Sequence, residues 1–232
     1  MESVLITGSN RGLGLEWAEQ YAGAGWRVYA TCRRPEQADA LRMLESAYRN
    51  LTVHRLDVTH GEEIAALAAE LAGEAIDVLL NNAGVYFEKF LEERLDTVDF
   101  ANWEETLRVN CLGAMQVSAA FCEHVARSKR RLVVAITSHM GSIAEIGSPG
   151  DYAYRSSKAA LNAAMKGLSL ALQPQGIGVL LLHPGWVQTR MGGPGATLTT
   201  RTSVSGMRKL VENFRLADTG HFYRFDGSTI PW

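Results

Sequence analysis

The chain alternates short apolar runs with longer segments in which apolar residues recur at helical spacing. Runs that are apolar throughout indicate strands buried on both faces, as in a parallel sheet covered by helices. Repeated strand–helix units with right-handed crossovers give a doubly wound sheet. The predicted strands are 4–7, 27–31, 52–56, 77–80, 132–136, 179–182 and 222–225, and the predicted helices are 12–24, 36–47, 61–72, 99–127 and 152–173.

A chain of 232 residues with 47% hydrophobic content is long enough to bury a full core. We therefore predict an α/β fold, a Rossmann-type doubly wound parallel sheet with helices on both faces, as a single domain over residues 1–232. Residues 186–220 are rich in glycine and threonine and interrupt the alternation. We expect them to form a substrate-binding lid within this domain, with a short helix near 203–216.

The composition argues against several classes of partner. A formal net charge of -2 gives no overall basic field, so we expect no nucleic acid and no membrane as a partner. The three cysteines lack CxxC spacing, which indicates free thiols in a reducing compartment, and the six histidines do not cluster, so no metal site is expected. No stretch approaches the ~18 apolar residues of a membrane span, and we expect a cytoplasmic protein.

A glycine turn links the first predicted strand to the first helix. Gly8 permits the tight turn, Gly12 lets the backbone approach a pyrophosphate, and Gly14 permits close helix packing. The helix N-terminus would offer N–H donors to the phosphates. A glycine turn without a ligand is the alternative. The candidate cofactor-binding residues of this turn are Gly8, Asn10, Arg11, Gly12, Leu13 and Gly14.

The end of the second strand predicts the choice of cofactor. An NAD enzyme places Asp or Glu there for the ribose hydroxyl, whereas this chain has Arg33 and Arg34. Arg33, or Arg34 in its place, can bind a 2′-phosphate together with Arg11. We therefore predict NADP (NADPH), with NAD as the alternative, while solvated surface arginines remain the competing interpretation.

Two further strand ends carry candidate cofactor contacts. Asp57, followed by Val58, can accept a hydrogen bond from an adenine amino group, although Asp also favours turns. Asn82, Ala83 and Gly84 end the fourth strand, where the amide can link neighbouring strands and Ala-Gly leaves room for a ribose. A simple strand-ending turn is the alternative for this second motif.

Tyr154 and Lys158 stand at i,i+4 and therefore share one helix face. A phenol titrates near a pH of about 10, so it relays protons poorly at neutral pH unless a cation stabilises the phenolate. Lys158 provides that cation. Ser138 follows the strand 132–136 and can hydrogen-bond the oxygen of a substrate carbonyl.

These motifs stand in the order found in a known family, and the chain resembles the short-chain dehydrogenases/reductases over essentially its whole length. Within that family it is most similar to the C-factor and sniffer-type carbonyl reductases. The motifs that carry this second resemblance are Ala30-Thr31-Cys32-Arg33, residues 152–162 and the ending 226–232.

The resemblance implies a role for each catalytic candidate. Tyr154 would be the general acid in reduction or the base in oxidation, and Lys158 would lower its pKa and hold the nicotinamide ribose. Ser138 would orient the carbonyl, with Ser142 in reserve because the spacing to Tyr154 is slightly longer than usual. Asn110 would hold a water for proton relay. The further cofactor contacts implied are Pro184, Gly185, Val187 and Thr189.

The sequence indicates the substrate and the oligomeric state less specifically than it indicates the cofactor. Large side chains at Tyr86, Phe87, Met140, Trp186 and Met191 suit an apolar pocket for a small-molecule carbonyl or alcohol, although such residues more often pack the core. The helices 99–127 and 152–173 suit a homodimer or homotetramer, or close packing on the sheet.

Together these observations predict an NADP-dependent oxidoreductase that transfers hydride between nicotinamide and a carbonyl or secondary alcohol. The alternative is a regulatory or signalling protein that senses a dinucleotide and has only incidental catalysis.

Overall fold

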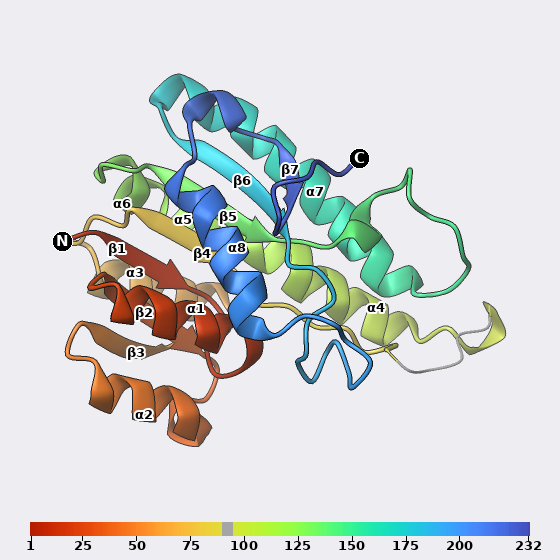
Figure 1. Ribbon diagram of the computed structural model, residues 1–232, viewed down its shortest axis with the longest axis horizontal. Coiled ribbons are helices and arrows are strands. Elements are labelled where there is room, and N and C mark those ends of the chain that lie inside the picture. The colour runs from red at the N-terminus through yellow and green to blue at the C-terminus, as the bar shows by residue number, and fades with distance from the viewer. Residues whose placement is uncertain (90–94) are drawn as a thin grey trace.

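The computed structural model describes residues 1–89 and 95–232 and is built on a seven-stranded sheet (Figure 1). The order is β3-β2-β1-β4-β5-β6-β7, and every neighbouring pair is parallel. This order confirms the predicted doubly wound sheet. The strands are β1 (Ser3–Ile6), β2 (Arg27–Cys32), β3 (Leu51–Arg55), β4 (Val78–Asn81), β5 (Leu132–Ile136), β6 (Gly178–His183) and β7 (Phe222–Arg224).

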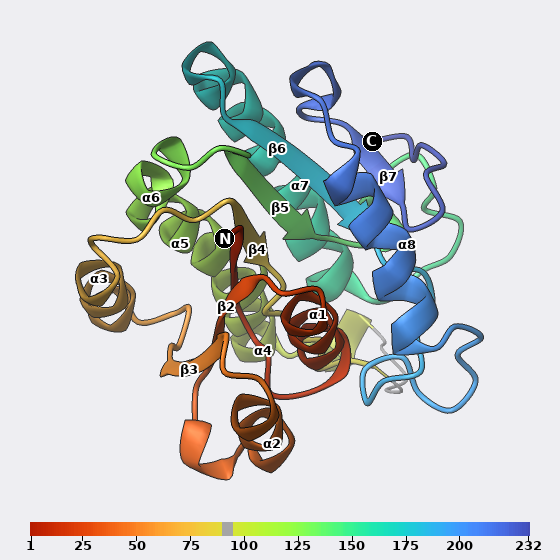
Figure 2. The same ribbon diagram turned by 60° about the vertical axis from the view of Figure 1, so that its left-hand side comes forward.

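Helices cover both faces of the sheet (Figure 2). Strand side chains alternate between two apolar clusters, as Leu5 of β1 and its neighbours Val4 and Ile6 illustrate. One face packs against α1 (Gly12–Gly23), α2 (Asp39–Ala47) and α8 (Thr200–Glu212). The other packs against α3 (Gly61–Glu70), α5 (Ala114–Ala120), α6 (Cys122–Ala126) and α7 (Tyr152–Leu172), and α4 (Phe100–Leu107) packs against α7.

The predicted continuous helix 99–127 is wrong in one respect. Between α4 and α5 the chain forms a π-helical turn, η3 (Arg108–Gly113), and α6 follows α5 as a separate short helix. Such turns redirect the side chains that follow and are frequent at functional sites. Here Gly113 lies so close to Val58 that a Cβ would come within 2.7 Å of its Cγ2, while Asn110 contacts Val85.

The chain after β6 contains a helix that lies close to its predicted position. This helix, α8, begins after Thr199, whose side chain accepts a hydrogen bond from the Thr202 N–H. It packs against α1 and contributes Val204, Met207 and Val211 to the core. Residues 200–212 therefore belong to the layer that covers the sheet, and the lid role of 186–220 stays a prediction.

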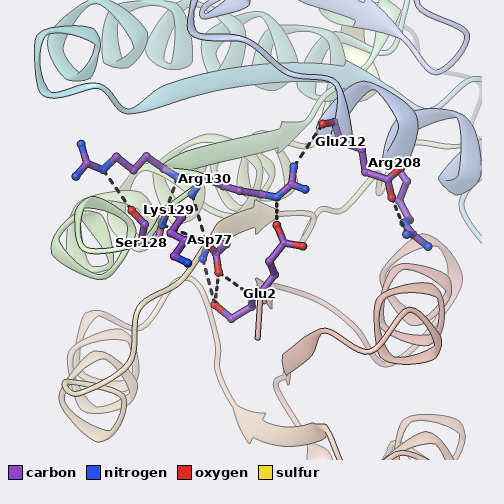
Figure 3. A network of polar contacts seen from close by, with 9 residues as sticks. Glu2, Asp77, Ser128, Lys129, Arg130, Arg208 and Glu212 are labelled. Atoms are coloured by element: carbon purple, nitrogen blue, oxygen red, sulfur yellow. Dashed lines mark hydrogen bonds and ion pairs between the residues drawn. The ribbon is translucent and has the colours of Figure 1, made fainter.

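A polar network lies at the amino edge of the sheet (Figure 3). The buried Asp77 precedes β4, and its carboxylate accepts hydrogen bonds from the N–H groups of Ser3, Lys129 and Arg130, at distances of 2.9 to 3.2 Å. Asp77 thus links the starts of β1, β4 and β5. The Arg130 guanidinium continues the network to Glu2, at 2.5 Å.

We expect Asp77→Asn to lower the free energy of unfolding by about 2 kcal/mol or more, because an amide NH₂ would replace a carboxylate oxygen that faces N–H donors. Urea denaturation measures this loss. The exposed Glu19→Gln on α1 is the control and should change stability by less than about 0.5 kcal/mol. Equal stability of the two variants would contradict the structural role of Asp77.

Candidate active site

The glycine turn lies where the chain leaves β1 and β4 in opposite directions along the sheet. Gly8 and Gly12 both have positive φ values, 70° and 56°. A Cβ on Gly14 would lie 2.2 Å from the Gly8 carbonyl oxygen. The helix α1 then begins without a side-chain cap and without an acidic residue in its first turn. Its first N–H groups therefore suit an anionic ligand such as a phosphate.

The end of β4 packs directly on this turn. The Asn82 amide donates to the carbonyl oxygens of Thr7 and Gly8, at 2.9 and 3.0 Å, and the Thr7 hydroxyl accepts from the N–H groups of Asn82 and Ala83. Asn82 thus links two neighbouring strands, as its amide chemistry predicts. A Cβ at Gly84 would lie 3.7 Å from the Lys158 ammonium, so this turn also borders the catalytic candidates.

Tyr154 and Lys158 are buried near the start of α7, beside the end of β5. The Lys158 ammonium donates to the Ile136 carbonyl oxygen at 2.9 Å and lies 5.9 Å from the centre of the Tyr154 ring. Ser138 follows β5, is buried, and lies close enough to the Tyr154 phenol to lower its pKa. The structure therefore brings these three candidates together.

Burial shifts the pKa values of the two titratable candidates in opposite directions. It raises the pKa of Tyr154 to about 12, against the lowering effect of Ser138 and with the help of the Glu88 and Asp151 carboxylates. It lowers the pKa of Lys158 to about 8. The expected lowering of the phenol pKa by Lys158 is therefore not seen, because burial outweighs other influences on Tyr154.

The geometry separates the two candidate serines. The Ser142 hydroxyl donates to the backbone carbonyl of Trp232, the last residue. Ser138 instead stands at the Tyr154 phenol, and its hydroxyl also accepts from the Met140 N–H at 3.1 Å. The preference for Ser138 as the substrate-orienting residue is supported by this placement and stays a prediction.

Asn110 lies in the π-helical turn, and its side chain is already engaged. Its amide oxygen accepts from the Val85 N–H at 2.8 Å, and its amide nitrogen donates to the Val85 carbonyl and the Ser157 hydroxyl. These contacts hold the segment after β4 against α7. The relay water attributed to Asn110 by resemblance remains a prediction.

The loop after β6 reaches the glycine turn. A Cβ at Gly12 would lie 3.4 Å from a methyl carbon of Thr189, and Val187 is buried in the same loop. The Pro184 carbonyl accepts a 2.6 Å hydrogen bond from Ser203 of α8, and Gly185 has a φ of 81°. These four predicted cofactor contacts therefore lie along a loop that borders the turn.

The residues predicted to bind the adenosine part of the cofactor lie at the surface or in a local turn. Arg11 and Arg33 are exposed, and Arg33 influences the Asp57 carboxylate electrostatically. Despite partial burial, hydrogen bonds from the N–H and hydroxyl of Thr59 hold the pKa of Asp57 below its ordinary value. Asp57 thus forms the local turn that was its alternative interpretation. Its neighbour Val58 packs against Gly113.

Exposed apolar side chains occur on the segments that border the site. Phe87, Trp186 and Met191 are 42%, 50% and 37% exposed, so core packing does not explain them. Tyr86 stacks directly on Tyr154, with ring centres 4.0 Å apart. The sequence indicates Tyr86 only as a pocket residue and gives no local signal for two carboxylates near Tyr154, those of Glu88 and Asp151.

Comparisons with known proteins agree with this geometry. The family model described as short chain dehydrogenase matches residues 2–197. The chain is 42% identical over 167 residues to the C-signal of Myxococcus xanthus, covering 72% of this chain and 99% of that protein. It also matches solved structures over its full length. These include the carbonyl reductase Sniffer of D. melanogaster (32% identity, all of that chain, TM-score 0.92) and the NADPH-bound carbonyl reductase from chicken fatty liver (31% identity, 99% of that chain, TM-score 0.92).

The chain belongs to the short-chain dehydrogenase family.

Membership makes the chain an oxidoreductase, similar to the C-signal and to sniffer-type carbonyl reductases. The motifs that indicated a short-chain dehydrogenase from sequence are the ones that the fold gathers at the carboxyl ends of β1, β4, β5 and β6. Among the described residues, no helix is both long and apolar enough to cross a membrane.

Because the glycine turn of this short-chain dehydrogenase is closely packed, a single methyl group added at Gly14 should destabilise the fold. Gly14→Ala places a Cβ against the Gly8 carbonyl and 2.6 Å from the Asn82 amide nitrogen, so we expect the free energy of unfolding to fall by about 1–3 kcal/mol. Gly167→Ala is the control, because a Cβ there would meet no atom within 4 Å beyond its chain neighbours and its own helix backbone, and it should stabilise α7 by up to about 1 kcal/mol. Urea denaturation measures both, and a neutral Gly14→Ala would contradict the packing.

Proposed function

We propose that this protein is an NADPH-dependent reductase of carbonyl compounds, which can also oxidise the corresponding secondary alcohols. The observation that carries this proposal is the convergence of Ser138, Tyr154 and Lys158 at the end of β5 and the start of α7. A binding protein has no need of a buried phenol, a hydroxyl and an ammonium at one place. The exposed Phe87, Trp186 and Met191 would offer apolar contacts to the substrate.

The residues present fit a dinucleotide. The uncapped start of α1 and the glycines at 8, 12 and 14 would receive the pyrophosphate, and Arg11 with Arg33 would bind the 2′-phosphate. NADP(H) is also the cofactor named for two similar structures, the chicken carbonyl reductase and a short-chain dehydrogenase/reductase from Burkholderia multivorans, and NAD is the alternative. Bound nicotinamide would supply the hydride.

The remaining contacts with the cofactor follow from the segments that border the turn. Gly84 and Lys158 would meet the nicotinamide ribose, and the loop from Pro184 to Thr189 would meet the carboxamide. Asp57 and Val58 would lie beside the adenine, with Asn10, Leu13, Asn82 and Ala83 completing the turn. Residues 186–220 would cover the bound substrate, and the homodimer or homotetramer likewise remains part of the proposal.

The protein's own groups would handle the proton. With a pKa of about 12, the Tyr154 phenol is protonated at neutral pH and can give its proton to the carbonyl oxygen as that oxygen gains charge. The Ser138 hydroxyl would donate a second hydrogen bond to this oxygen. The Lys158 ammonium, held by the Ile136 carbonyl, would stabilise the phenolate that is left.

The alternative function is a dinucleotide-sensing regulatory or signalling protein. It is favoured by the 42% identity to a protein named C-signal. The two functions differ in whether the proton donor is needed for the biological effect.

Tyr154→Phe separates these functions, because it removes the transferable proton and keeps the ring. We expect kcat for reduction of para-nitrobenzaldehyde to fall by about 100-fold or more. NADPH binding, followed by its fluorescence, should be retained. Undiminished turnover in this variant would refute the mechanism. A wild-type protein that binds NADPH tightly but reduces no member of a carbonyl panel would favour the sensing function.

Arg33→Ala tests the choice of cofactor. Loss of a charge-assisted hydrogen bond to the 2′-phosphate should weaken NADPH binding by about 10-fold or more and leave NADH binding nearly unchanged. Titration calorimetry with both cofactors measures the ratio. The exposed Arg49→Ala, beyond the end of α2, is the control. An unchanged NADPH-to-NADH ratio in Arg33→Ala would show that Arg33 is a solvated surface charge.

A further inference from the structure

The segment after β4 contacts the proton donor in two ways. The Tyr86 ring stacks on the Tyr154 ring, with centres 4.0 Å apart and planes 13° apart. Two residues later, the buried Glu88 accepts a hydrogen bond from the Tyr154 backbone N–H at 2.5 Å. The side chain and the backbone of one residue are therefore both held by a single short segment. Neither contact belongs to the glycine turn or to the Ser138–Lys158 pair.

Asp151 connects this segment to the start of α7. It is the residue before the helix and has a left-handed backbone, with a φ of 55°, yet its side chain does not cap the helix. Instead the carboxylate accepts the hydrogen bond of the Tyr86 hydroxyl and lies 4.0 Å from the Arg155 guanidinium. The capping role falls to Glu88, which reaches the third helical N–H from another part of the chain.

The segment is itself fixed at its other end. Both polar backbone groups of Val85 are hydrogen-bonded to the Asn110 side chain from the π-helical turn. Because Asn110 also contacts Ser157 of α7, the contacts form a closed path from η3 through the segment to the catalytic helix. Contacts that fix the segment beside the Tyr154 ring also restrict the position of that ring, and a fixed position favours proton transfer.

The electrostatic surroundings of the Tyr154 phenol come from four elements. Glu88 from the segment after β4 and Asp151 from the start of α7 raise its pKa beyond the effect of burial, and Ser138 after β5 lowers it. Lys158 lies 5.9 Å from the ring on α7, with Cys111 of η3 near its ammonium. Burial and the bond to Asp151 also raise the pKa of Tyr86, which therefore remains a hydrogen-bond donor.

We propose that Tyr86 and Asp151 are positioning residues for the proposed reduction: Tyr86 fixes the Tyr154 ring by stacking, and Asp151 holds Tyr86 and contributes its charge to the site. The inference rests on the proposed function, because it assigns these residues a role through the proton donor. An aromatic ring at position 86 is then required, whereas its hydroxyl only orients that ring. The negative charge of Asp151 favours the protonated form of the donor.

The experiment compares Tyr86→Leu, Tyr86→Phe and Asp151→Asn in the full chain, with NADPH and para-nitrobenzaldehyde. Tyr86→Leu removes the stack and should lower kcat by about 10-fold or more, since a small displacement of a reacting group is costly. Tyr86→Phe keeps the ring and should stay within about 3-fold of wild type. Affinity for NADPH should not change in either variant, because Tyr86 is not among the proposed cofactor contacts.

Asp151→Asn tests the electrostatic role of Asp151 through the pH dependence of kcat, which a purely structural role would not change. Asn tolerates the left-handed backbone and can still accept from Tyr86, so the change removes mainly the charge. Without that charge the protonated form of Tyr154 is less favoured, and the upper midpoint of the kcat–pH profile should move to lower pH by about half a unit or more. The exposed Asp39→Asn, in the first turn of α2, is the control.

Three outcomes overturn the inference. They are wild-type or higher kcat in Tyr86→Leu, equal loss in Tyr86→Phe and Tyr86→Leu, and an unchanged pH midpoint in Asp151→Asn. Tyr154→Phe, assayed beside them, distinguishes the two proposals. Full activity of Tyr154→Phe refutes the proton donor and this inference with it. An inactive Tyr154→Phe beside unaffected Tyr86 and Asp151 variants refutes this inference alone.

Discussion

The close contact between the glycine turn after β1 and the end of β4 is the constraint on which the site depends. A Cβ on Gly8 would lie 2.9 Å from the Ala83 Cα, and the Asn82 amide donates to two carbonyl groups of the turn. The chain leaves β1 and β4 in opposite directions, which opens a crevice at the carboxyl edge of a doubly wound sheet. The side-chain amide satisfies the carbonyls at this point, while the N–H groups at the start of α1 keep no side-chain partner.

Buried polar groups around α7 are likewise hydrogen-bonded within the protein. Lys158, Ser138 and Asn110 are all buried, and each has a partner within the protein: the Ile136 carbonyl, the Met140 N–H and the Val85 backbone. Buried polar groups that are hydrogen-bonded have few alternative orientations. The π-helical turn matters here because it carries Asn110 to Val85 while Gly113 packs on Val58.

Much of the fold could be predicted because its causes are local. Strands such as β5 are apolar on both faces, and the glycine turn follows β1 directly, so neighbouring residues carry the signal. The π-helical turn could not be predicted, since its residues fit an α-helical pattern and the contact that explains it, Gly113 with Val58, joins residues far apart in sequence. Tertiary contact overrides local preference there.

Among the catalytic candidates, too, features with local causes could be predicted and features that depend on tertiary contacts could not. Tyr154 and Lys158 could be predicted as a pair because their i,i+4 spacing alone places both side chains on one helix face. The contacts among Tyr86, Glu88, Asp151 and Tyr154 could not be predicted, because their hydrogen bonds join residues 65 and 66 positions apart, without a repeating pattern. The raised pKa of the phenol could not be predicted for a related reason, since burial depends on every element packed around the ring.

Burial shifts the pKa values of Tyr154 and Lys158 in opposite directions, and the surrounding groups act on each differently. It favours a neutral phenol and a neutral amine, since a charge is costly away from water. The neutral phenol is the form that gives a proton, and the Glu88 and Asp151 carboxylates reinforce it. The Ile136 carbonyl, in contrast, accepts a hydrogen bond from the ammonium. In the proposed reduction, this arrangement would place a protonated Tyr154 beside a Lys158 that still carries its charge.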